Sequence, residues 1–190
     1  MKIKHIYIIR HPQTEYNLKG VFQGLSDSAI TEEGFSQLRK LHKKFESVKI
    51  DAIYSSPLKR CVTVAENFAQ SHKVDVMYDV RLKEICYGSW DEKSKQDIGF
   101  AQIKREKDKN RFNYRHPGQY EGINGESYKD LYDRLSPFWQ EIRERNDVEI
   151  LVVGHTGVMM AAKKYFEKLS DAEISEYRPS NIEVLKYEIV

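Results

Sequence analysis

Cysteine is scarce in this sequence, and long apolar runs are absent. Only two cysteines, Cys61 and Cys86, occur among the 190 residues, too few for a disulfide framework, so a reducing, cytoplasmic environment is expected. The apolar run at the N-terminus stops at Arg10, too early for a secretory signal, and no stretch is long enough to cross a bilayer. The sequence therefore argues against a disulfide-rich scaffold and against a membrane protein.

Net charge is also small. The chain has 31 Lys and Arg against 29 Asp and Glu, a formal net charge of +2. This balance provides no overall attraction to nucleic acid or to an anionic membrane, and neither is expected as a partner. The hydrophobic fraction of 40% and the length suit one domain with a sizeable core. Any attraction for an anion must therefore be local.

Short strand patterns alternate with helical patterns along the chain. Apolar, mostly β-branched runs predict strands at 6–9, 52–54, 74–78, 149–153 and 181–190. Helices are predicted from the capping residues Thr31, Ser56 (with Pro57 at the first helical position) and Ser127, and again over about 158–169. The first helix is expected to bury Phe35, Leu38, Leu41 and Phe45. This alternation predicts one three-layer α/β/α domain over residues 1–190, with a mostly parallel sheet and an irregular cap, inserted at about 88–125, over the carboxyl ends of the strands.

Basic residues gather where the expected strands end. Two strands run into Arg10-His11 and Gly154-His155, and Arg60 lies in the first turn of the helix after the second strand. Open α/β sheets bind ligands beyond the carboxyl ends of their strands, and guanidinium groups suit phosphate oxygens. A lone histidine at a strand end is usually structural, and a lone helical arginine is usually solvated. Because two arginines and two histidines coincide at one edge, an anion site is expected there.

The same residues carry a resemblance to a known family. Arg10-His11-Pro12-Gln13-Thr14-Glu15-Tyr16-Asn17 resembles the Arg-His-Gly-x-Thr-x-x-Asn signature of the histidine phosphatase (phosphoglycerate mutase-like) superfamily. Further blocks follow in the same order: Gln23-Gly24 with Asp27, Ser55 to Arg60, Arg81 to Ile85 with Gly88 and Trp90, Gly125-Glu126-Ser127, and Val153-Gly154-His155. The resemblance spans nearly the whole chain and implies a small phosphatase that needs neither a metal ion nor a cofactor.

The resemblance also implies a role for each matching residue. His11 would be the nucleophile and would form a covalent phosphohistidine. Arg10, Arg60 and His155 would stabilise charge on the phosphoryl oxygens. Glu84 would protonate the leaving oxygen and then activate water. Further substrate contacts would come from Asn17, Gln23, Gly24 and Thr156.

The main departure from the family pattern is Pro12, which stands where the family has glycine. Proline lacks an N–H and favours extended backbone in the residue before it, so one contact is lost while the nucleophile stays at a strand end. Other phosphate chemistries fit less well. The sequence has no Gly-x-x-x-x-Gly-Lys-Ser/Thr loop, no cysteine phosphatase loop and no cluster with metal-ligand spacing.

Three functions stay open at this point, and hydrolysis of a small phosphomonoester leads. The first rival is a phosphoglycerate mutase, although mutases that resemble this chain carry Glu-Arg-His-Tyr-Gly in place of Glu84-Ile85-Cys86-Tyr87-Gly88. The second rival is a catalytically weak relative that binds a phosphorylated ligand or a protein partner, suggested by Pro12. A homodimer is compatible with each of these functions.

One segment of the expected cap is strongly basic. From position 93 to 116 there are eight Lys or Arg (93, 95, 104, 105, 107, 109, 111, 115) and three acids (97, 106, 108), which is 8 − 3 = +5. The segment is either a solvated loop or a surface that recruits substrates with a second anionic group.

Overall fold

This computed structural model describes residues 4–189, and the side chains of the same range except 105–109. Val190, the last residue of the expected tail strand, lies outside the described residues. So do the side chains of Arg105, Lys107 and Lys109, three of the cations in the expected basic segment.

The centre of the molecule is a five-stranded sheet in the order β3-β2-β6-β1-β7. Its strands are β1 (Lys4–Arg10), β2 (Ala52–Ser55), β3 (Val76–Tyr78), β6 (Glu149–Gly154) and β7 (Val184–Ile189). The first four run parallel, and β7 pairs antiparallel with β1. The central pair, β1 and β6, is in register up to Arg10 opposite Gly154. Both strands therefore end at the same level of the sheet.

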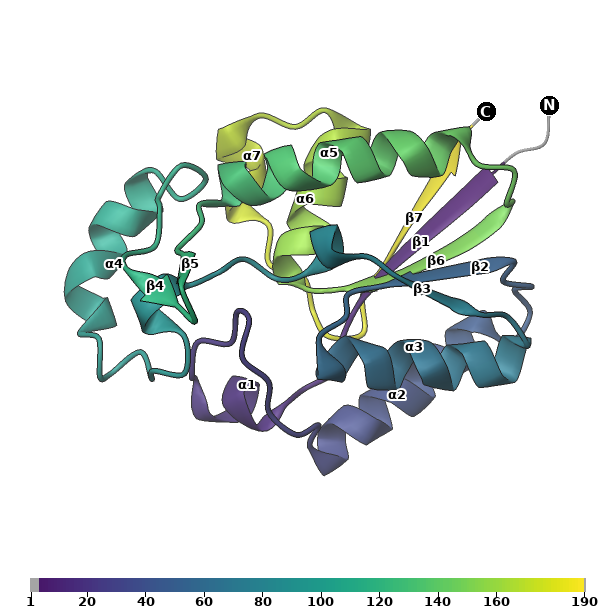
Figure 1. Cartoon of the computed structure of the whole chain (residues 1–190), viewed down its shortest axis with the longest axis horizontal. Coiled ribbons are helices and arrows are strands. Elements are labelled where there is room, and N and C mark those ends of the chain that lie inside the picture. The colour runs from purple at the N-terminus through teal and green to yellow at the C-terminus, as the bar shows by residue number, and fades with distance from the viewer. Residues whose placement is uncertain (1–3, 190) are drawn as a thin grey trace.

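Helices cover both faces of the sheet (Figure 1). On one face lie α2 (Glu32–Phe45) and α3 (Lys59–His72), and on the other lie α5 (Tyr128–Glu144), α6 (Thr156–Glu167) and α7 (Asp171–Glu176). Side chains alternate across each strand, so Ile6 and Ile8 join the α5–α6 core while Tyr7 and Ile9 join the α2–α3 core. The predicted three-layer α/β/α fold with a mostly parallel sheet is confirmed.

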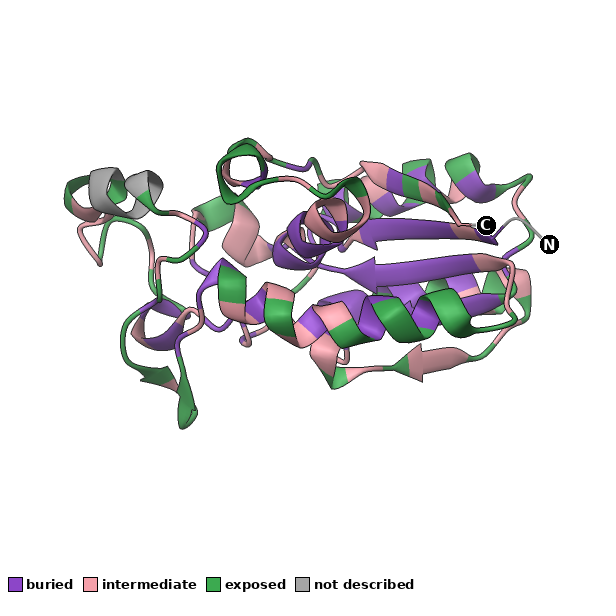
Figure 2. Ribbon diagram, turned by 90° about the horizontal axis from the view of Figure 1, so that it is seen from above, coloured by how far each residue is buried: buried purple, intermediate pink, exposed green. Residues whose placement is uncertain are grey.

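The segment from Gly88 to Gly125 lies beyond the carboxyl ends of the parallel strands, next to the short helix α1 (Glu15–Lys19) (Figure 1). It is less irregular than expected, because it contains η2 (Gly88–Trp90), α4 (Phe100–Lys109) and the hairpin of β4 (Gln119–Tyr120) and β5 (Ile123–Asn124). Much of its surface is exposed (Figure 2). Its inner side is an aromatic cluster of Phe22, Tyr87, Trp90, Phe100, Tyr114 and His116. Phe22 is far in sequence from the other members of the cluster, so a local hydrophobic pattern could not predict this packing.

Two details of the expected helices are wrong. Phe35 is 45% exposed, because the turn at the start of α2 faces inward through Gly34. A Cβ at Gly34 would lie 2.3 Å from the carbonyl oxygen of Gln13, so only glycine fits there. The buried stripe of α2 is thus Gly34, Leu38, Leu41 and Phe45.

The second helix starts later than expected. Its N-cap is Leu58, which has no capping side chain, so Ser56 is not the N-cap and Pro57 precedes the helix. The first amides of α3 are capped from another segment: Asp27 accepts from the backbone N–H of Lys59 (2.9 Å) and of Arg60 (3.4 Å). Ser56 Oγ accepts from the backbone N–H of Leu58 (3.3 Å) and also contacts a histidine, as described below. After β3, the short 3-10 helix η1 (Val80–Leu82) connects that strand to Glu84.

Candidate active site

Three neighbouring strand ends bring the predicted basic residues together. The ladder continues one step past β1 and β2, since His11 N–H donates to the Gly154 carbonyl (3.0 Å) and Ser56 N–H to the Val153 carbonyl (3.0 Å). His155 follows β6 directly and is the N-cap residue of α6. Arg10, His11, Arg60 and His155 thus form one group, here called the basic cluster. The prediction that they meet at one edge is confirmed by the register of the strands.

His11 is held with one ring nitrogen engaged. Its side chain is buried, and Nδ1 lies 2.8 Å from the carbonyl oxygen of Pro12. Only a protonated Nδ1 can donate to a carbonyl, so this contact leaves a lone pair on Nε2. Burial and the nearby guanidinium groups of Arg60 and Arg10 hold the pKa of His11 well below 6.5. The ring is therefore neutral at pH 7, and Pro12 supports it through its carbonyl group although its N–H is missing.

His155 faces His11 across the cluster. The two ring centroids are 5.3 Å apart, and the planes are tilted by 62°. His155 Nε2 lies 2.8 Å from Ser56 Oγ, which fixes the ring. Burial, Arg60 and His11 hold the pKa of His155 well below 6.5. Two neutral imidazoles beside two arginines make a site in which an anion would favour protonation of a ring.

Arg60 is bound mainly to the loop from Gly24 to Asp27. Nη1 donates to the Ser26 carbonyl (2.6 Å) and to Asp27 Oδ1 (2.8 Å), and Nη2 donates to the Gly24 carbonyl (2.7 Å). Its Nε is buried without a hydrogen-bond partner among residues 4–189. Three of the five N–H groups are used, so Nε–H and one N–H of Nη2 are left on the same edge. That edge matches two oxygens of a tetrahedral oxyanion.

Arg10 is more loosely held. Nη1 lies 3.4 Å from Asn181 Oδ1 and Nη2 lies 3.5 Å from Asn17 Oδ1, while the buried Nε has no partner in the described part of the chain. Asn181 also donates from Nδ2 to the His11 carbonyl (3.1 Å). Sequence reasoning missed Asn181, because a single asparagine before the tail strand carries no signal.

The predicted substrate contacts are mostly engaged with the protein. Gln23 accepts from Thr14 Oγ1 (2.6 Å) and donates to Ser28 Oγ (3.1 Å). Gly24 binds Arg60 through its carbonyl and donates its N–H to Asp91 Oδ1 (3.0 Å). Both residues shape the loop that clamps Arg60. Asp91 also accepts from Leu25 N–H and from Ser26 Oγ, so the cap holds this loop.

Asn17 and Thr156 lie at helix starts close to the cluster. Asn17 belongs to the capping box of α1, and its Oδ1 accepts from Thr14 N–H (3.3 Å) as well as from Arg10. Thr156 is the first residue of α6, directly after His155. The positive end of the α6 dipole therefore points toward the basic cluster.

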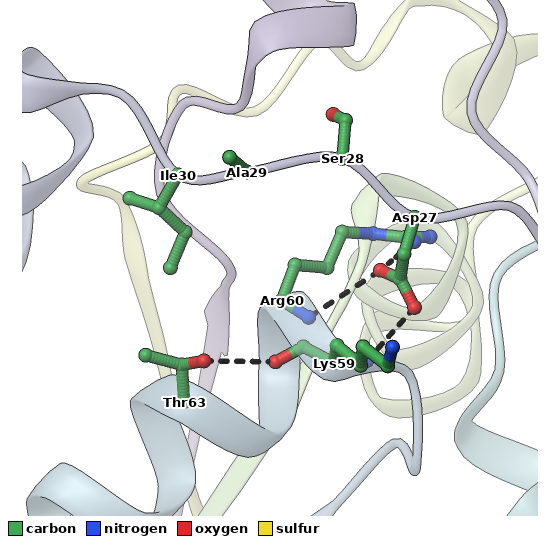
Figure 3. Close-up of a pocket in the computed structure, with 7 residues that line it drawn as sticks. All are labelled: Asp27, Ser28, Ala29, Ile30, Lys59, Arg60 and Thr63. Carbon is green, nitrogen blue, oxygen red and sulfur yellow. Dashed lines mark hydrogen bonds and ion pairs between the residues drawn. The ribbon is translucent and has the colours of Figure 1, made fainter.

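A cavity of about 320 Å³ adjoins the basic cluster through Arg60. Figure 3 shows its lining, which consists of the stretch from Asp27 to Ile30 together with Lys59, Arg60 and Thr63 of α3. The Arg60 guanidinium group lies beside Asp27 in this view. The cavity therefore flanks the clamp on Arg60, and neither histidine lines it.

Glu84 is a buried carboxyl group that lies close enough to Arg60 and Arg10 to feel their charges. Its Oε1 accepts from its neighbour Ile85 N–H (2.9 Å) and from Gly157 N–H (3.1 Å) in the first turn of α6. A Cβ at Gly157 would lie 2.4 Å from Glu84 Oε1, so glycine is required for this approach. Burial raises the pKa of Glu84, although both N–H donors and the charge of Arg60 oppose the shift. Tyr87 and Tyr128 lie close enough to feel the Glu84 charge, and burial raises the pKa of both phenols.

The described residues contain neither a metal-binding cluster nor a membrane-spanning helix. Within the described residues, no group of three His, Cys, Asp or Glu side chains is arranged to hold a metal ion. Among the helices of residues 4–189, none combines the length and apolar character required to span a bilayer.

Comparisons with known proteins agree with this geometry. The family model of the histidine phosphatase superfamily (branch 1) matches residues 6–189. Phosphoserine phosphatase 1 of Hydrogenobacter thermophilus is 32% identical over 157 residues, which cover 82% of this chain and 72% of that protein. A 2,3-bisphosphoglycerate-dependent phosphoglycerate mutase of Staphylococcus epidermidis is 26% identical over 213 residues, covering 97% and 93%.

Among solved structures, the mycobacterial glucosyl-3-phosphoglycerate phosphatase in complex with VO3 superimposes with a TM-score of 0.85. Its sequence identity is 24%, and the match covers 96% of this chain and 92% of that one, which shows a shared fold. Together with the family match over residues 6–189, these findings establish that the chain belongs to the histidine phosphatase superfamily (branch 1).

Proposed function

We propose that this protein hydrolyses small phosphomonoesters through a phosphohistidine formed on His11, within a single domain and without a metal ion. The observation that carries the proposal is the arrangement at His11. Its Nδ1 is engaged by Pro12, which leaves the lone pair of Nε2 available for attack, and the charges of Arg60 and Arg10 act on the same ring. The phosphatase predicted from the sequence is confirmed by the phosphatases among its relatives.

In the first step, Nε2 of His11 attacks phosphorus while the bond from phosphorus to the ester oxygen breaks. The leaving oxygen takes the proton of Glu84, whose raised pKa favours the protonated acid. Arg10 and Arg60 bind the non-bridging oxygens through their Nε edges, and His155 donates to the same group once the anion is present. The products are phosphohistidine, the free alcohol and the Glu84 carboxylate.

In the second step, the Glu84 carboxylate takes a proton from water while the water oxygen attacks phosphorus. The bond from phosphorus to Nε2 breaks, inorganic phosphate forms, and His11 returns to its neutral state. Glu84 is again protonated, so the cycle closes. Arg10, Arg60 and His155 supply the charge stabilisation that a divalent cation supplies in other phosphatases.

The substrate class is proposed from the relatives. One acts on phosphoserine and another on glucosyl-3-phosphoglycerate by name, and both substrates are small phosphorylated metabolites with a carboxylate. A panel of phosphorylated metabolites, assayed for phosphate release with and without excess EDTA, tests the proposal. We expect release from several of them, unaffected by EDTA. A requirement for added Mg²⁺ or Zn²⁺ would contradict it.

The covalent step has its own test. Alkaline quenching during turnover of a ³²P-labelled substrate should leave acid-labile label on His11, located by peptide mapping. Label on His155, or an acid-stable label on serine or aspartate, would overturn the assignment of the nucleophile.

A mutase is the second candidate, since mutases occur among the relatives. At the positions where similar mutases carry Arg-His, this chain has Ile85 and Cys86, which are 0% and 1% exposed. Neither offers a cation to a second phosphate. We therefore expect negligible conversion of 3-phosphoglycerate to 2-phosphoglycerate in the presence of 2,3-bisphosphoglycerate. A weak binding relative is disfavoured because all the proposed catalytic side chains are present, and p-nitrophenyl phosphate turnover tests it.

A further inference from the structure

Residues 83–87 are here called the Glu84 segment. Arg134 of α5 lies beside this segment, and every N–H of its guanidinium group is bound in or next to it. Nη1 donates to the carbonyl oxygens of Arg81 and Lys83, and Nη2 donates to the Glu84 carbonyl (3.4 Å). Nη2 and Nε also bind Glu126, at 3.0 Å from Oε2 and 3.1 Å from Oε1. Five acceptors thus engage five N–H groups, and three of them are backbone carbonyls of one short segment.

Glu126 extends this hold to the other side of Glu84. Its Oε2 accepts from Cys86 N–H (2.9 Å), and its own backbone N–H donates to the Cys86 carbonyl (2.8 Å). The backbone is therefore bound before and after Glu84 by one ion pair. Residues 83–87 belong to no helix or strand, so no backbone ladder performs this task.

The position of that backbone decides where the Glu84 carboxyl group lies. A general acid must come within about 3 Å of the oxygen that it protonates, and a displacement of about 1 Å can cost two orders of magnitude in rate. We propose that Arg134, together with Glu126, is the positioning residue for the proton donor of this enzyme. The inference rests on the proposed function, in which Glu84 is the acid.

Stability alone is a poor explanation for the pair. The two side chains are 25% and 20% exposed, and partly exposed ion pairs contribute little to folding. A matched control is available on the same helix. Arg81 forms a close ion pair with Glu141 of α5 (2.7 Å), and that pair joins two side chains and binds no backbone group of residues 83–87.

The test compares two substrates that differ in their need for an acid. Phenolate leaves p-nitrophenyl phosphate unaided, whereas an alkoxide must be protonated to leave glycerol 2-phosphate. For each variant we measure the ratio of kcat/KM on glycerol 2-phosphate to kcat/KM on p-nitrophenyl phosphate, together with the urea midpoint. The constant kcat/KM reports phosphorylation of His11, whereas hydrolysis of the phosphohistidine is common to both substrates. Glu84→Gln calibrates the assay and should lower the ratio by about 10²–10⁴-fold, the usual contribution of general acid catalysis.

Arg134→Met should lower the same ratio at least about tenfold while leaving kcat/KM for p-nitrophenyl phosphate nearly intact. Glu126→Gln should act in the same direction, and Arg134→Lys should restore part of the loss because it can still donate to the carbonyls. Glu141→Gln should leave the ratio unchanged. If Arg134→Met does not fold, the isosteric Glu126→Gln decides.

The outcomes separate the two claims. If Glu84→Gln lowers the ratio and neither Arg134→Met nor Glu126→Gln does, the positioning role is overturned while the proposed function stands. Equal losses on both substrates, with a lowered urea midpoint, would mean that the pair is only structural. If Glu84→Gln itself does not change the ratio, Glu84 is not the acid, and the inference falls with that assignment.

Discussion

The basic cluster and the Glu84 segment lie close together and are built in different ways. His11 and His155 continue backbone ladders of the central sheet, so register alone sets their positions. Glu84 lies in a stretch without regular structure, and its place depends on the N–H groups of Ile85 and Gly157 and on Arg134. The comparison suggests that phosphate binding is a property of the sheet, whereas proton donation is a property of side-chain contacts around a loop.

Burial shifts the pKa values of the two regions in opposite directions. Burial disfavours charge, so it lowers the pKa of His11 and His155 and raises that of Glu84. The same desolvation thus favours the neutral form of both the proposed nucleophile and the proposed acid. Variants that act on only one of the regions should separate binding of the phosphoryl group from departure of the alcohol.

The largest effect is expected for His11→Ala. Loss of the nucleophile removes the covalent route, and we expect kcat to fall by at least about 10⁴-fold on every substrate. Phosphate release from p-nitrophenyl phosphate and from glycerol 2-phosphate measures it, with His72→Ala, outside the site, as the control. Substantial residual turnover on either substrate would show that another group attacks phosphorus.

The next prediction concerns pH and acts on both regions at once. Protonated His11 cannot attack, so kcat/KM should rise as pH increases through its lowered pKa, below 6.5. Ionised Glu84 cannot donate, so kcat/KM for an alkyl phosphate should fall as pH increases through its raised pKa, above 4.5. The pH profile for alkyl phosphates is therefore expected to be bell-shaped, with one limb from each group. For p-nitrophenyl phosphate the falling limb should be absent, and a falling limb shared by both substrates would argue against Glu84 as the acid.

Asp91→Asn should disturb the basic cluster and spare the acid. Asp91 accepts from the N–H groups of Gly24 and Leu25, and this loop in turn clamps Arg60. An amide cannot accept from both N–H groups with separate oxygens, so the clamp should loosen. We expect KM and the inhibition constant of inorganic phosphate to rise about tenfold, the effect of losing one charged hydrogen bond. The rise should be equal for both substrates, and a selective loss on the alkyl phosphate would erase the distinction between the regions.

The smallest effect is expected outside both regions, at Phe35. Because its side chain is 45% exposed, Phe35→Ser should change the free energy of unfolding by less than about 0.5 kcal/mol and leave both activities unchanged. Leu38→Ala, one turn further along α2 and 5% exposed, should cost about 2–5 kcal/mol. Urea denaturation compares the two. A large loss of unfolding free energy for Phe35→Ser would instead support the buried helix face predicted from the sequence.

Sequence reasoning was most successful where structure repeats locally. Apolar runs announce the strands, and because parallel strands end at a common edge, the meeting of His11 and His155 followed from their places in the chain. It was least successful where contacts cross the chain. The cap of α3 by Asp27, the contact of Asn181 with His11, and the helix α4 inside the expected irregular cap were not predicted.

The sequence by itself determined the α/β/α fold, the family and the set of reactive groups, because hydrophobic period and motif order are written along the chain. Only the tertiary structure decided which nitrogen of His11 is free, which edge of Arg60 is open and how the Glu84 segment is held. These depend on distances of about 3 Å between residues far apart in sequence, and hydrogen bonds of that kind follow no period. The sequence thus identifies the chemical groups of the candidate site, and the packing around them determines their protonation states and orientations.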